Sequence, residues 1–298
     1  MQFKKLTLED KNLIDKYINP YKFLSCEYSF TSLYIWKDAC DVQFSILNNV
    51  LILKKKDFNG NYHFMQPLGY TKENLENIIE TLMHYKDENH MRYLFKDLEE
   101  GFIEEIKALL KENKCLCIKE DRDNFDYLYE AEKLMSFSGK KLHAKKNHYN
   151  YFTKHYNYEV VDINSDKVIK DVIVAAEKWY EDTEEKDDKL YYELLAIKDI
   201  AANMKILGLN GVAVYVDGAL SAFSIGESLN EKLAVIHIEK GDKDIQGIYS
   251  FIARTLVDRC FSNAEIINRE QDLGIEGLRK AKMSYYPLKL EKKFILSV

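Results

Sequence analysis

The second half of the chain alternates between helical and strand patterns of apolar residues. Val168, Val172 and Ala176 recur at helical spacing, so we expect a helix over residues 167–180. An Asp217-Gly218 pair between two apolar runs favours a β-hairpin. The other expected elements, in chain order, are a strand at 158–163, a helix at 190–206, strands at 212–216, 220–225 and 233–238, a helix at 247–261, a strand at 265–267, a short helix at 275–282 and a strand at 288–296.

This order of elements, β-α-α-β-β-β-α-β-α-β, is that of the GNAT acyltransferase fold. In that fold the sheet splays open after its fourth strand, and the next helix points its N-terminus at the cofactor's pyrophosphate. We predict an α/β protein with mixed sheets (α+β). It would consist of two tandem GNAT-like acyltransferase domains, at residues 1–130 and residues 131–298, and a basic helix would precede the second domain. The first half repeats the order more loosely and without residue-level identity, with helices at 7–17, 30–36, 71–85 and 102–111 and strands at 42–47, 50–53, 62–65, 92–95 and 116–119.

Composition narrows the class of protein. The 298 residues are 46% hydrophobic and 31% charged, which is typical of a folded globular chain. No run approaches the roughly 18 apolar residues of a transmembrane helix, and the start lacks the apolar core of a signal peptide, so we expect a cytoplasmic protein without a transmembrane segment. The five cysteines include no CxxC pair; Cys115 and Cys117 would share one face of a strand, and buried thiols are favoured over a metal or redox site.

A basic block interrupts this acidic chain of net charge −6. Residues 133–158 contain no acid but hold six lysines and three of the seven histidines. If residues 139–152 are helical, Lys141, Lys145 and His148 share one face. Lysines interleaved with aromatic residues suit contact with phosphates and stacking of single-stranded bases. The alternative is a solvated helix between the domains.

Charged residues gather after the strand at 265–267. Glu239 ends the central strand and Glu270 ends the next one, so parallel strands would bring both carboxylates to the same edge. One carboxylate would deprotonate an attacking amine, while the other pairs with Arg269 or Lys282. Tyr285 would protonate the leaving oxygen. The alternative is a buried salt-bridge network that holds the last helix on the sheet.

The loop before the expected helix at 247–261 departs from the usual acetyl-CoA pattern. Acetyl-CoA-binding GNAT proteins carry Gln/Arg-x-x-Gly-x-Gly/Ala at this place, but alignment on Gly247 puts Asp244 and Tyr249 where Gln/Arg and the second glycine would stand. The helix N-terminus can still bind a phosphate. Tyr249 would crowd a pyrophosphate, and Asp242 and Asp244 would repel it. An ordinary helix start is the alternative.

Three stretches resemble the bacterial family related to the C-terminal domain of lysyl-phosphatidylglycerol synthase. The resemblance implies tandem GNAT-like domains, like those of the Fem aminoacyltransferases, and an aminoacyl-tRNA as donor. In the lipid-modifying enzymes this domain follows a membrane region that presents the lipid acceptor, and this sequence contains no such region. The stretches are Ser138-Gly139-Lys140-Lys141-Leu142-His143-x-Lys145-Lys146-Asn147-His148, Glu239-Lys240-x-Asp242 with Ile245-Gln246-Gly247-x-Tyr249, and Asn268-Arg269-Glu270-x-Asp272-Leu273-Gly274 through Tyr285-x-Pro287.

We therefore predict an acyltransferase that moves an aminoacyl group from tRNA to an acceptor amine or hydroxyl of a small molecule, a peptide or a lipid headgroup, without a tightly bound cofactor. The alternatives are an acetyl-CoA-dependent N-acetyltransferase and a non-catalytic module that binds RNA or peptide. The candidate residues are Glu239, Glu270 and Tyr285 for catalysis; Arg269, Asp272, Arg279, Lys282 and Lys240 for substrate binding; and Lys140, Lys141, Lys145, His148, Gln246, Gly247 and Tyr249 for the donor or its phosphates.

Overall fold

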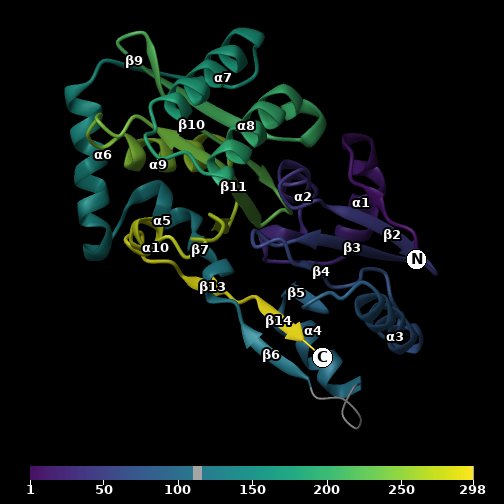
Figure 1. Cartoon of the computed structure of the whole chain (residues 1–298). Coiled ribbons are helices and arrows are strands. Elements are labelled where there is room, and N and C mark those ends of the chain that lie inside the picture. The colour runs from purple at the N-terminus through teal and green to yellow at the C-terminus, as the bar shows by residue number, and fades with distance from the viewer. Residues whose placement is uncertain (110–115, 298) are drawn as a thin grey trace. The chain divides into compact units, whose positions relative to one another are not determined.

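Two mixed β-sheets organise the chain, one in each of two units (Figure 1). The computed structural model of the protein describes residues 1–109 and 116–297. The first unit comprises Met1–Phe125 together with Glu291–Val298, and the second comprises Asp126–Leu290. The chain therefore enters the second unit near the expected boundary at residue 130 and returns to the first unit for its last strand, a return that the sequence did not predict.

The first unit contains a seven-stranded sheet in the order β1-β2-β3-β4-β5-β14-β6. The strands β4 and β5 run parallel and the other neighbours are antiparallel. Its core joins apolar side chains of β3 with those of α3 and α4. The elements are β1 (Lys4–Lys5), α1 (Lys11–Ile18), α2 (Phe30–Ile35), β2 (Gln43–Leu47), β3 (Val50–Lys56), β4 (Tyr62–Phe64), α3 (Lys72–Glu88), β5 (Phe95–Leu98), α4 (Glu100–Leu109), β6 (Cys117–Glu120) and β14 (Phe294–Ser297).

The second unit contains another seven-stranded sheet, in the order β13-β7-β12-β11-β10-β9-β8. Its strands β11 and β12 run parallel, and the helix α9 follows β11 in the chain. The elements are β7 (Asp126–Glu130), α5 (Ala131–Ser136), α6 (His143–His155), β8 (Tyr158–Asp162), α7 (Asp166–Glu181), α8 (Asp188–Leu207), β9 (Asn210–Val216), β10 (Ala219–Ser228), β11 (Leu233–Gly241), α9 (Ile248–Cys260), β12 (Ile266–Asn268), α10 (Glu276–Met283) and β13 (Lys289–Glu291).

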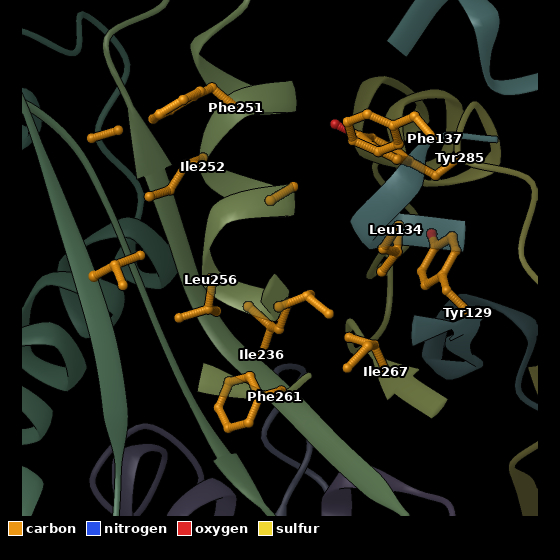
Figure 2. Close-up of a cluster of buried hydrophobic side chains, with 14 of the residues drawn as sticks. Tyr129, Leu134, Phe137, Ile236, Phe251, Ile252, Leu256, Phe261, Ile267 and Tyr285 are labelled. Carbon is orange, nitrogen blue, oxygen red and sulfur yellow. The ribbon is translucent and has the colours of Figure 1, made fainter. Parts of the chain in front are cut away.

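The helix α9 is the centre of the second unit's core (Figure 2). Its buried positions Phe251, Ile252 and Leu256 follow helical spacing and share a cluster with Ile236 of β11 and Ile267 of β12. Burial of each such side chain contributes about 1.5–3 kcal/mol. This packing fixes the first turn of α9 against the central strands of the sheet.

The parallel pair β11–β12 splays open. Pairing between β11 and β12 ends at Val235 and Asn268. Beyond Asn268 the chain stays beside β7, its other neighbour, because Arg269 N donates to Tyr127 O. The strand β11 continues to Gly241. A wedge therefore opens between the two strands, as expected for the GNAT fold.

A β-bulge lies in β11 beside this wedge. In the ladder with β10, Ile225 pairs with Ile238 and Gly226 pairs with Ile236, so His237 is the extra residue. A bulge re-aims the side chains that follow it. Glu239 consequently faces the α9 side of the sheet, whereas His237, two positions earlier, faces the side of α7. Strict strand alternation would have put both on one face.

The fold class and the tandem GNAT-like organisation are confirmed, and most expected elements occur within a few residues of their expected positions. The single strand expected at 288–296 is wrong, because β13 and β14 occupy that range and belong to different sheets. The strand expected at 92–95 begins at Phe95 instead. The strand β7 and the helix α5 were missed. Cys115 and the end of the helix expected at 102–111 lie outside the described residues.

The helices of the described residues include none that combines the length and the apolar content needed to cross a lipid bilayer.

Candidate active site

A buried ion pair closes the wedge on the α9 side of the sheet. Arg269 Nη2 donates to Glu239 Oε1 at 2.7 Å, and the two side chains are 11% and 13% exposed. Among the described residues, neither Glu239 Oε2 nor Arg269 Nη1 has a hydrogen-bond partner, although both atoms are buried. An unsatisfied buried polar atom costs about 1–3 kcal/mol. One acceptor and one donor held side by side in this way indicate a place where a polar ligand group or an ordered water binds.

Aromatic rings and a lysine surround the arginine. The Arg269 guanidinium carbon lies 4.5 Å from the Tyr285 ring centroid and 5.6 Å from that of Tyr129. Lys145 Nζ stands 3.9 Å from the centroid of the Tyr285 ring. Burial, together with the nearby Arg269 charge, lowers the pKa of Lys145 to about 8. Burial raises the pKa of Tyr285, whose hydroxyl also contacts Ser250.

Five segments that are distant in sequence supply these groups. Lys145 comes from α6, Ser250 from the first turn of α9, Tyr129 from β7, Arg269 from the end of β12, and Tyr285 from the turn after α10. In Figure 2, Tyr285 and Phe137 lie together beside α10, and Tyr129 lies nearer to Ile267. With Glu239 from β11, an acid, two cations and two tyrosines thus gather where the sheet splays.

A second buried cluster lies on the α7 side of the sheet. His237 Nδ1 contacts Glu270 Oε1 at 2.8 Å, and His237 Nε2 contacts Glu227 Oε1 at 2.9 Å. Burial opposes the charged imidazole, but the two carboxylates outweigh it and raise the pKa of His237 to about 9. The two predicted acids Glu239 and Glu270 therefore both lie where β11 and β12 diverge, yet each has its own cationic partner.

The segment after Arg269 is fastened by a buried carboxylate. Asp272 accepts from Arg279 Nε at 2.8 Å and Arg279 Nη2 at 2.7 Å, and also from the Tyr127 hydroxyl at 2.5 Å. Although burial opposes ionisation, these hydrogen bonds hold the pKa of Asp272 below its ordinary range. Lys282 Nζ donates to the Arg269 carbonyl oxygen. Asp272, Arg279 and Lys282 thus join α10 to the sheet, which is the salt-bridge arrangement that the sequence left open as an alternative.

Replacing Asp272 by asparagine should lower the free energy of unfolding by about 2 kcal/mol, because the charge-assisted hydrogen bonds from Arg279 and Tyr127 weaken. Urea unfolding followed by circular dichroism measures the effect. The exposed Asp258→Asn on α9 is the control and should stay within about 0.5 kcal/mol of the unsubstituted protein. Equal stability of the two variants would show that Asp272 does not fasten α10.

The loop before α9 leaves few backbone amides for a phosphate. The amide of Asp242 donates to Ser221 O, that of Asp244 to Asp242 Oδ1, and that of Gln246 to the Tyr156 hydroxyl, at 2.8, 2.9 and 3.2 Å. Gly247 has φ +90°, and a Cβ there would clash with the His148 carbonyl oxygen, so the backbone of α6 packs directly on the start of α9. The Tyr249 hydroxyl donates to Gly241 O at 2.8 Å.

The structure brings some of the predicted site residues together and places others elsewhere. Glu239, Arg269, Tyr285 and Lys145 come together. Lys240 instead donates to Glu193 of α8 at 2.5 Å. The remaining residues of the basic set, Lys140, Lys141 and His148, are exposed on α6 and the short 3₁₀ turn before it.

Three residues beside these clusters were missed in the sequence. Tyr129 lies on the unrecognised strand β7, so no periodicity pointed to it. Ser250 could have been found as the small polar residue in the first turn of α9, next to Tyr249. Glu227 gave no signal, because it ends an apolar strand next to a turn.

Comparison with known proteins identifies the family to which this chain belongs. The family model described as phosphatidylglycerol lysyltransferase, C-terminal, matches residues 18–297. A conserved protein of unknown function from Bacteroides thetaiotaomicron VPI-5482 is 29% identical in sequence, with a TM-score of 0.90 and coverage of 99% of each chain. An uncharacterized protein of Mycoplasmoides gallisepticum is 29% identical over 183 residues, so the match spans 61% of this chain and only 58% of that relative.

More distant structures share the fold. The C-terminal domain of a putative lysylphosphatidylglycerol synthetase from Agrobacterium fabrum has a TM-score of 0.65 at 13% identity, with 97% of this chain and 90% of that chain covered. FemX has a TM-score of 0.59 at 9% identity, and a tandem GNAT protein from the clavulanic acid biosynthesis pathway has 0.52 at 8%; each match covers 99% of this chain and 97% of the other. The chain belongs to the phosphatidylglycerol lysyltransferase C-terminal family, an acyltransferase-type family with the tandem GNAT fold.

Proposed function

We propose that the protein transfers an aminoacyl group from aminoacyl-tRNA to an acceptor amine or hydroxyl at the wedge between β11 and β12. The observation that carries the proposal is the buried Glu239–Arg269 pair, which holds one acceptor and one donor atom unsatisfied next to Lys145 of the basic helix α6. The family description names a lysyltransferase, and lysyl transfer is one case of aminoacyl transfer.

The groups at the wedge match the steps of this reaction. Glu239 Oε2 takes the proton from the attacking amine or hydroxyl as the new bond to the acyl carbon forms. Arg269 Nη1 donates to the oxyanion that develops on that carbon. The ester bond to the tRNA ribose then breaks, and the leaving oxygen takes one proton from the Tyr285 hydroxyl, which holds it at neutral pH because burial raises its pKa. The neighbouring Lys145 ammonium stabilises the negative charge that develops during this step.

The geometry of the loop before α9 favours tRNA over acetyl-CoA as donor. A pyrophosphate at this helix start needs free backbone amides and a close approach to the backbone. Three loop amides already donate within the protein, and α6 covers Gly247. An aminoacyl-tRNA instead presents an acyl ester on a polyanionic strand, which fits the exposed lysines of α6 and of the 3₁₀ turn before it. A rise in melting temperature with acetyl-CoA but not with charged tRNA would reverse this choice of donor.

The basic helix provides a direct test of tRNA binding. Replacing Lys140 and Lys141 together by glutamate should weaken the affinity for charged tRNA about tenfold and flatten its salt dependence, because two phosphate-contacting charges are reversed. Fluorescence anisotropy at several salt concentrations measures both effects. The control is the exposed Lys170→Glu on α7, which should leave both values nearly unchanged. Equal losses in the two variants would mean that Lys140 and Lys141, on the 3₁₀ turn before α6, contribute only general charge.

A further inference from the structure

A second β-bulge lies where the chain leaves β12. Arg269 N donates to Tyr127 O at 3.0 Å, and Tyr127 N donates to Glu270 O at 3.1 Å. Two consecutive residues therefore oppose one residue of β7, which is the arrangement of a β-bulge. A bulge re-aims the side chains at it, and here Arg269 reaches Glu239 while the next residue, Glu270, reaches His237.

The backbone of Glu270 adopts a conformation that few side chains favour. Its φ is +55°, in the left-handed region, where a residue with a Cβ persists only when its surroundings hold it there. Asn268 supplies part of that hold, because its Oδ1 accepts from Glu270 N at 2.7 Å. This hydrogen bond spans Arg269, so it fixes the backbone on both sides of the arginine.

Asn268 is itself held by a buried carboxylate. Its Nδ2 donates to Asp126 Oδ2 at 2.9 Å, and both residues are 0% exposed. The backbone amide of Glu270 only donates and the Asp126 carboxylate accepts, so a single orientation of the Asn268 amide satisfies both neighbours. A reversed amide would set donor against donor and acceptor against acceptor. Buried polar groups that are satisfied in one arrangement only specify the local backbone uniquely.

We propose that Asn268 is a positioning residue that holds Arg269 in its orientation at the wedge. The Asn268 amide joins Asp126 to the Glu270 backbone. This link holds the bulge from which the Arg269 guanidinium reaches Glu239. A donor stabilises an oxyanion best when it is fixed in place before the reaction. The effect on transfer rests on the proposed function, whereas the orientation of Arg269 does not.

Replacing Asn268 by alanine should lower kcat for aminoacyl transfer about 10–100-fold per folded molecule and leave KM for charged tRNA nearly unchanged, because a misplaced donor weakens the transition state alone. Circular dichroism gives the folded fraction by which the rates are divided. The control is Asn203→Ala, which removes an amide hydrogen bond of 2.9 Å to Asp199 O within α8 and should transfer at the normal rate.

NMR of protein that contains isotope-labelled arginine reads the orientation of Arg269 without any substrate. In the unsubstituted protein the ion pair with Glu239 should slow the rotation of the guanidinium group, so that its Nη protons give separate signals. Asn268→Ala should broaden or merge these signals, whereas Asn203→Ala should leave them unchanged. Arg269→Lys identifies the signals by their disappearance.

A swapped pair separates positioning from a loss of packing. Asp126→Asn combined with Asn268→Asp restores one bond between an amide and a carboxylate and again offers an acceptor to Glu270 N. The transfer rate and the arginine signals should therefore return close to those of the unsubstituted protein. If the alanine variant does not fold, Asn268→Ser takes its place. Its hydroxyl still accepts from Glu270 N but is too short to reach Asp126, so it should transfer about tenfold more slowly.

Two results would overturn the inference. A normal kcat per folded molecule and unchanged arginine signals in the Asn268 variant would leave Asn268 with a role in stability alone. A swapped pair that does not fold, or that stays as slow as Asn268→Ala with the same altered signals, would show that the bond to Asp126 does not position Arg269. If the unsubstituted protein transfers no aminoacyl group, the proposed function fails, and the arginine signals alone decide the role of Asn268.

Discussion

Replacing Glu239 by glutamine should lower the rate of aminoacyl transfer by about 10²–10⁴-fold, because the amide cannot accept the proton of the attacking group. The same change leaves the buried Arg269 without a charged partner, so we also expect the free energy of unfolding to fall by about 3 kcal/mol. Single-turnover transfer from charged tRNA, expressed per folded molecule, separates the two effects.

Two further variants make this result interpretable. Glu239→Asp keeps the negative charge next to Arg269 but withdraws the carboxylate by one methylene, so it should be more stable than the glutamine variant and still slow. Glu265→Gln removes an exposed carboxylate that pairs with Lys232 at the other end of β12, and it should transfer at the normal rate. A folded Glu239→Gln variant that transfers as fast as Glu265→Gln would remove Glu239 from the mechanism.

Raising the pH from about 6.5 to about 9 should destabilise the protein through His237. The folded-state pKa of His237 is raised to about 9, above the ordinary value of about 6.5 in the unfolded chain. The stabilisation is therefore complete below about pH 6.5 and is lost as the pH rises through about 9. The difference corresponds to about 3 kcal/mol at the most, since one pKa unit equals about 1.4 kcal/mol.

Urea unfolding of the protein and of His237→Gln across this pH range isolates the effect. Glutamine can still hydrogen-bond to Glu227 or Glu270 but does not titrate, so its free energy of unfolding should decline less over the same range. Parallel curves for the two proteins would mean that His237 is neutral when folded and that Glu227 and Glu270 do not hold it as an imidazolium.

Hydrophobic periodicity specified the elements but not every strand partner. The helices at α7, α8 and α9 and the strands β9 to β11 follow directly from apolar spacing and one Asp-Gly turn. The segment from Leu288 to Leu296 reads as one strand, because its pattern does not say that β13 joins the second sheet while β14 joins the first. The short β7 was missed because its apolar run, Tyr127-Leu128-Tyr129, is only three residues long and is flanked by Asp126 and Glu130.

Only part of the candidate site could be predicted from the sequence. The gathering of charge after β12 pointed to Arg269 and Glu270, and parallel pairing brought Glu239 to the same edge. The bulge at His237 decides which face each acid takes, and a bulge depends on how β10 pairs with β11 rather than on local residue preference. For the same reason the sequence could not distinguish the Glu239–Arg269 pair, which keeps two atoms without hydrogen-bond partners, from the Asp272–Arg279 pair, in which Arg279 donates twice to the carboxylate.

Release of a labelled aminoacyl group from charged tRNA tests the central claim most directly. The purified protein is mixed with charged tRNA and a pool of acceptors that contains phosphatidylglycerol vesicles, small amines and peptides. We expect the label to leave tRNA faster than spontaneous hydrolysis and to appear on one acceptor class, with Glu239→Gln slower by about 10²–10⁴-fold. Label that stays on tRNA, or leaves it only at the spontaneous rate with both proteins, would contradict the account.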